Sequence, residues 1–170
     1  MSSDQLNRRL RLQRCRNKRP AIVQGLSNLL GMEVSLDQFI PLEESDALRT
    51  EIGAQLRATD AICEVTWPGA AREDVAAYLR FLARESQHSE FIVFQSYSED
   101  LGALSFSGER IIESALVLTR LQEEDAILAT RDGDHGLMLE HEARDEWGNP
   151  YEHFSLKLWG SFKRDWEKIN

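Results

Sequence analysis

The first thirty residues contain apolar positions at helical spacing, interrupted once. A first helix is predicted over about residues 4–19, with Asp4 as its N-cap, because the leucines that follow recur four residues apart. Pro20 lacks the amide hydrogen that a helix interior needs, so we expect this helix to end there. A second apolar segment over 21–30 stops at Gly31, which is typical of a helix C-terminus.

Further helices are predicted in the middle of the chain. Ser45 is placed to open one of them, whose apolar residues share a face at intervals of four: Leu48, Ile52 and Leu56. A second helix spans residues 72–86, with an apolar stripe made by Val75, Tyr78, Leu79 and Leu82. A third follows Gly108 and buries Ile111, Ile112, Ala115, Leu116 and Leu118.

The other apolar runs have strand character. Residues 61–67 alternate, whereas residues 91–94 are apolar at every position and predict a central strand buried on both faces. Another strand is predicted over 101–106. The closing strands are 126–130, 137–139 and 151–159, with a tight turn at Asp132-Gly133.

Helices therefore come early and a meander of strands comes late. We expect an α+β fold in which a helical N-terminal part packs on an antiparallel sheet formed largely by C-terminal hairpins. A length of 170 residues, 42% of them hydrophobic, suits one globular domain over 1–170.

The charge is divided unevenly along the chain. The net charge is -9, yet residues 1–20 hold seven basic residues against one acid. The rest of the chain has 13 Lys and Arg against 28 Asp and Glu, a net of -15. A basic helix or arm at about 4–19 on an acidic body is indicated. Such a body attracts basic partners, although acidity can also serve solubility alone.

Several protein classes are excluded by the sequence. No apolar run approaches the ~18 residues of a membrane span, and no apolar core follows the N-terminal charges as a secretory signal requires. Two cysteines are too few for a disulfide framework. We therefore expect a cytoplasmic protein with no membrane contact.

The densest polar cluster lies in the predicted turn and on the strand after it: Asp132, Asp134, His135, Glu140, His141 and Glu142. On one regular strand the two histidines point to one face and the two glutamates to the other. Metal ligands must converge, so this parity argues against a metal site. The sequence also lacks a nucleophile motif and a phosphate-binding glycine loop. We expect no metal, no cofactor and no catalytic residue.

An aromatic residue in a predicted turn indicates a protein partner. Trp147 stands beside Gly148, where its neighbours cannot easily bury it, and it follows Asp145 and Glu146. A tryptophan with acidic surroundings suits the centre of a protein–protein interface.

The last third of the chain, from EDAILATRDGDHGLMLEHE through DEWGNPYEHFSLKLWGSF, resembles the closing hairpins of small immunity proteins of bacterial polymorphic toxin systems, contact-dependent or type VI. The resemblance implies a cytosolic protein that binds and neutralises a cognate secreted toxin, often a nuclease whose active cleft is basic. It brings no catalytic residues, and it does not explain the basic N-terminal helix.

The first hypothesis is a non-enzymatic inhibitor that covers a basic toxin surface with its last hairpins. Its predicted partner-binding residues are Asp132, Asp134, Glu140, Glu142, Asp145, Glu146 and Trp147. Two alternatives belong to other classes. One is a metal-assisted hydrolase or nucleotide-processing enzyme that uses Asp132, Asp134, His135 and His141. The other is a regulatory protein that touches nucleic acid through residues 8–19, although this arm can equally lie across the acidic face of its own chain or be a solvated helix.

Overall fold

Helices and strands alternate through most of the chain. The computed structural model describes residues 3–58, 62–68, 72–120, 125–144 and 150–167. Its helices are α1 (Ser3–Leu30), the 3-10 helix η1 (Leu36–Gln38), α2 (Leu42–Arg57), α3 (Arg72–Glu85), α4 (Ser98–Leu101), α5 (Arg110–Glu113), α6 (Ala115–Leu118) and α7 (Ser161–Glu167). Its strands are β1 (Ile62–Pro68), β2 (Glu90–Phe94), β3 (Leu104–Ser107), β4 (Ala126–Ala129), β5 (Gly136–Arg144) and β6 (Pro150–Trp159).

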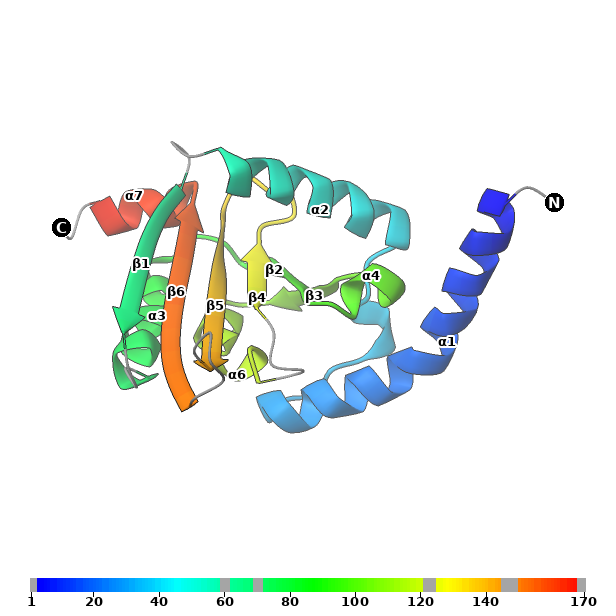
Figure 1. The fold of residues 1–170 in the computed structure, drawn as a ribbon, viewed down its shortest axis with the longest axis horizontal. Coiled ribbons are helices and arrows are strands. Elements are labelled where there is room, and N and C mark those ends of the chain that lie inside the picture. The colour runs from blue at the N-terminus through cyan, green and yellow to red at the C-terminus, as the bar shows by residue number, and fades with distance from the viewer. Residues whose placement is uncertain (1–2, 59–61, 69–71, 121–124, 145–149, 168–170) are drawn as a thin grey trace.

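The described strands form one antiparallel sheet in the order β1-β6-β5-β4-β2-β3. The consecutive strands β4, β5 and β6 lie side by side in it (Figure 1), which confirms the α+β class and the contribution of the C-terminal hairpins. The strand β2 lies between β4 and β3, and residues 91–94 are buried as their uninterrupted apolar run predicts.

One face of the sheet is covered by helices α3, α5, α6 and α7 and by part of α1. The pairing register places Leu137 opposite Leu158 and Leu139 opposite Leu156, so these four side chains share a face. All four are fully buried in one large cluster, to which α3 adds Val75, Leu79 and Leu82. The alternation predicted for the last strand is therefore correct, and its apolar side faces the main core.

The opposite face is covered only in part, by α2. A second cluster gathers α2 residues, strand residues and the indole of Trp159, which donates to the carbonyl oxygen of Gly133 at 3.0 Å. Figure 1 shows α2 lying across one end of the sheet, while the remainder of β1, β6 and β5 on that side has no helix over it. This uncovered area is where polar side chains can face a partner.

The N-terminal helix differs from the prediction. It does not end near Pro20 but continues through it to Leu30, and Figure 1 shows the helix bending along its length. Both segments are anchored in the same core, since Cys15 before the proline and Leu26 after it are buried. Packing on both sides offsets the lost hydrogen bond, and proline bends the helix rather than ending it. Among the described residues, no helix is long and apolar enough to cross a bilayer.

The helix that Ser45 was expected to open begins earlier, at Leu42 after Pro41. The Ser45 hydroxyl is buried and accepts a hydrogen bond from the amide of Ala103 at 3.0 Å, so it satisfies a loop amide instead of capping its helix. The helix expected after Gly108 is divided into α5 and α6, separated by Ser114.

Candidate functional site

The uncovered part of the sheet carries acidic side chains from neighbouring strands. The register aligns Glu64 of β1 with Lys157 of β6, and Ser155 of β6 with Glu140 of β5. The Lys157 ammonium lies 2.6 Å from a Glu140 oxygen, and the Ser155 hydroxyl donates to Glu64 at 2.7 Å. Further along β5, Glu142 belongs to the same side and is 69% exposed. We call the side formed by these five residues the open face.

The open face is electrostatically negative. Partial burial alone would lower the pKa of Lys157, but the bond to Glu140 and the charges of Glu140, Glu64 and Asp125 outweigh it, so the pKa is raised. One ammonium is thus surrounded by three carboxylates, and Glu142 adds a fourth along the strand. A basic surface that approached this side would meet an excess of negative charge.

A cavity adjoins the open face. It measures about 510 Å³ and lies between α2, the strands β2, β4 and β5, and the start of α4. Its apolar lining comes from Ile52, Leu56, Phe94, Ile127 and Met138, and its polar lining includes Arg49, Glu99 and Asp125. Met138 precedes Glu140 by two residues on β5, so the cavity and the open face share one side of the sheet.

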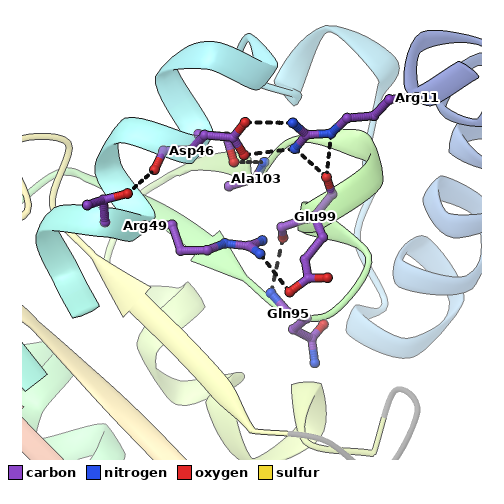
Figure 2. Close-up of polar contacts among 9 residues, drawn as sticks. Arg11, Asp46, Arg49, Gln95, Glu99 and Ala103 are labelled. Atoms are coloured by element: carbon purple, nitrogen blue, oxygen red, sulfur yellow. Dashed lines mark hydrogen bonds and ion pairs between the residues drawn. The ribbon is translucent and has the colours of Figure 1, made fainter. Parts of the chain in front are cut away.

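Ion pairs join the helices at and beside this cavity. Arg49 of α2 lies 3.0 Å from the Glu99 carboxylate of α4. Arg11 of α1 donates to both Asp46 oxygens, at 2.6 and 2.7 Å, and its Nε donates to the Glu99 carbonyl oxygen at 2.7 Å. Figure 2 shows the two guanidinium groups on either side of Glu99. The hydrogen bond from Arg11 lowers the pKa of Asp46 and raises that of Arg11.

The basic arm lies against its own chain. Besides Arg11, Lys18 lies 3.3 Å from Asp100, and Arg19 donates to the Leu101 carbonyl oxygen at 2.7 Å while stacking over the Phe39 ring. Arg11 and Lys18 therefore lie against acidic residues of their own chain, whereas Arg19 contacts a backbone carbonyl and an aromatic ring. Arg11 and Arg19 are partly buried in these contacts, whereas Arg14, Arg16 and Lys18 stay exposed.

The predicted turn residues have a structural role. The Asp132 carboxylate accepts from the Thr130 hydroxyl at 2.5 Å and from the Asp134 amide at 3.1 Å, and the bond from Thr130 lowers its pKa. Gly133 has φ of 77°, a conformation that favours glycine. This turn precedes β5, whereas Glu142 lies near its far end, so the two groups of predicted acids do not meet.

The two histidines of the predicted cluster are also separated. His135 precedes β5; its Nδ1 accepts from the Ser161 amide at 2.9 Å, and its ring stacks on His88 at 4.7 Å. His141 lies six residues on and stacks on Phe154 at 4.6 Å. Within the described ranges, no three His, Cys, Asp or Glu side chains are grouped so that they could hold a metal ion. The geometry therefore does not assemble the set proposed for a hydrolase.

His141 belongs instead to a small charged group at the end of the hairpin. Its Nε2 lies 3.6 Å from the Glu152 carboxylate, which accepts from Arg72 Nε at 2.8 Å. Burial is the main cause that lowers the pKa of His141, and Arg72 lowers it further, so the imidazole is held neutral. The hydrogen bond from Arg72 lowers the pKa of Glu152.

Part of the predicted partner-binding set lies outside the described residues, namely Asp145, Glu146 and Trp147. Of the remainder, Glu140 and Glu142 lie on the open face, and Asp132 and Asp134 form the turn. Sequence reasoning missed Glu64 and the cavity beside Met138. Alternation within β1 marks Glu64 as outward-facing, but no local signal places β1 next to β6. Comparison of the chain with models of protein families, with curated proteins and with solved structures gave no match.

Proposed function

We propose that this protein is a non-enzymatic inhibitor that binds a basic partner through the open face. In the form that the C-terminal resemblance implies, the partner is a secreted bacterial toxin with a basic active cleft, and the inhibitor acts in the cytoplasm. The observation that carries the proposal is the arrangement of Glu64, Glu140 and Glu142 on a sheet surface without a helix over it, next to an apolar cavity.

The charge of the open face would speed association with a basic partner, and the cavity would strengthen the complex once formed. Carboxylates that surround one lysine steer a basic partner toward the sheet and raise the association rate, most strongly at low salt. The adjoining cavity supplies what the acidic surface lacks, since tight interfaces combine a polar rim with an apolar pocket that a partner side chain fills. The open face and the cavity together provide both.

The test begins with the product of the gene immediately upstream, co-expressed with this chain. We expect the two to purify as a complex and the neighbour's toxicity to be suppressed. The pair of reversals Glu64→Lys and Glu142→Lys should then lower the association rate about tenfold at low salt and reduce its salt dependence. Glu85→Lys, an exposed reversal on α3 across the sheet, is the matched control and should change neither.

The hairpin tip provides a second comparison. Reversing Asp145 and Glu146 to lysine should slow association severalfold, whereas Trp147→Ala should cost about 2 kcal/mol, mainly through faster dissociation. A complex that forms with unchanged rates in all of these variants would show that neither surface is the interface. If the product of the upstream gene is neither bound nor neutralised, this chain is not an inhibitor of that protein.

A further inference from the structure

The first half of α1 exposes apolar side chains that the proposed function does not use. Leu6, Leu10 and Leu12 are 45%, 44% and 46% exposed, and Leu6 and Leu10 stand one helical turn apart. Figure 1 shows this end of α1 lying away from the sheet. We call residues 3–10 the tip of α1. Exposed leucines at helical spacing are typical of a helix that docks into an apolar groove.

The tip cannot fill the cavity of its own chain. Arg11 follows it directly in the same helix and is held to Asp46 and to the Glu99 carbonyl oxygen. A continuous helix does not turn back on itself, so Leu6 and Leu10 stay beyond this attachment. A surface that covered them would therefore have to come from another molecule.

The cavity has a feature that keeps it open. Gly53 lines it from the interior of α2, where glycine costs about 1 kcal/mol relative to alanine. A Cβ at this position would meet only the end of the Arg57 side chain, at 3.5 Å, which is an ordinary contact. Neither backbone conformation nor crowding therefore requires glycine here. A side chain at position 53 would instead reduce the volume of the cavity.

We propose that the tip of α1 from one copy docks into the cavity of a second copy when no basic partner occupies it, so that the dimer and the proposed complex use the same cavity in turn. The apolar lining of Ile52, Leu56, Phe94, Ile127 and Met138 matches Leu6 and Leu10 in character. The charges also match, because the tip carries Arg8 and Arg9, whereas the cavity lining, among the described residues, holds two carboxylates, Glu99 and Asp125, against one guanidinium, that of Arg49. The acidic body, with its net charge of -15, favours the approach of a basic helix from any side.

Two such contacts close a symmetric dimer. Each copy offers one tip and one cavity, so a twofold arrangement satisfies both at once and leaves no free end. The dimer contains two equivalent contacts, each between two unlike surfaces, instead of one contact between like surfaces. This distinguishes it from a dimer in which the two tips pair with each other.

Sedimentation velocity on the full chain, from about 1 to about 200 µM, tests the proposal by mass action. The wild-type chain is expected to shift from monomer to dimer over this range, and added salt is expected to weaken the dimer. The paired substitution Leu6→Glu and Leu10→Glu removes the apolar tip and should raise the dimer dissociation constant at least about tenfold. Gly53→Met fills the cavity and should do the same while leaving the chain folded.

Mixing these two variants gives the decisive measurement. The Gly53→Met chain keeps an intact tip and the Leu6→Glu, Leu10→Glu chain keeps an intact cavity, so one of the two contacts can form between them. Their mixture should associate more strongly than either variant alone. Gly31→Ala, a substitution just beyond the end of α1, is the control for a general loss of stability.

Three results would overturn the proposal. A wild-type chain that sediments as a monomer at every concentration shows that the tip does not bind this cavity. A dimer that persists in Gly53→Met places the contact elsewhere, as tip-to-tip pairing would. A mixture that associates no better than its components shows that tip and cavity are not partners, whichever other molecule covers the leucines.

Discussion

The two faces of the sheet differ in how completely they are covered and in the side chains they carry. On one, Leu139, Leu156 and Leu158 are fully buried under helices from four parts of the chain. On the other, α2 covers one end, and the strands beyond it present Glu64 and Glu142. The same strands supply both faces, because alternate side chains point to opposite sides.

The two faces differ in how much they contribute to folding and in how much charge they leave exposed. Apolar area removed from water supplies most of the folding free energy, and the larger buried cluster lies on the covered face, with a smaller one under α2 on the other side. Exposed charges contribute little to stability but act at a distance on a charged partner. Substitutions on the two faces should therefore affect different measurements.

The largest effect is expected on the covered face. Leu156→Ala removes a fully buried side chain that faces Leu139 and Val65 across the neighbouring strands, and should lower the free energy of unfolding by about 2–5 kcal/mol. Thr66→Ala, one strand away on the exposed side, should change it by less than about 0.5 kcal/mol. Urea unfolding measures both. Equal losses would mean that the faces do not differ in packing.

The next largest effect is expected on the pH dependence of stability, through His141 on the covered face of the hairpin. The pKa of His141 is lowered from 6.5, so the unfolded chain takes up its proton first as the pH falls. The folded state therefore loses stability as the pH drops below 6.5, by about 1.4 kcal/mol for each unit of the lowering. His141→Phe should flatten this part of the stability curve. An unchanged slope between pH 7 and pH 5 would show that His141 charges as readily in the folded chain.

A smaller effect of opposite sign is expected on α2. Gly53→Ala should stabilise the chain by about 0.5–1 kcal/mol, because the residue is helical and a Cβ meets no obstacle. Gly31→Ala should destabilise it, since φ at this helix end is 63°. Thermal unfolding separates the two. A loss of stability in Gly53→Ala would mean that glycine is required for the packing of α2, and that keeping the cavity open is not the reason for it.

The smallest effect on stability is expected on the open face. Glu142→Gln removes a largely exposed charge and should change the free energy of unfolding by less than about 0.5 kcal/mol. If the open face binds a basic partner, the same variant should still slow association at low salt. A clear loss of stability would place Glu142 among the structural residues.

The sequence predicted the elements that depend on neighbouring residues better than those that depend on contacts between distant residues. The apolar stripe of Val75, Leu79 and Leu82 predicted α3 almost to the residue, because a helix of this kind is decided by its own spacing. The prediction that the first helix ends at Pro20 was wrong, because the residues that pack against α1 on either side of the proline are distant in the sequence. Part of the candidate site was predicted from the sequence, namely Glu140 and Glu142. Glu64 was not, because it lies beside them only through the pairing of β1 with β6 and of β6 with β5.

The sequence by itself determined the α+β class, the alternation of β6 and the buried character of β2, because each follows from which side chains must leave water at a period of two or 3.6 residues. Only the tertiary structure decided that Arg11 meets Asp46, 35 residues away, that His135 accepts a hydrogen bond from Ser161 and that His141 stacks on Phe154. It also decided that α2 leaves a cavity beside Met138. Such contacts have no local period, since they depend on how whole elements pack against one another.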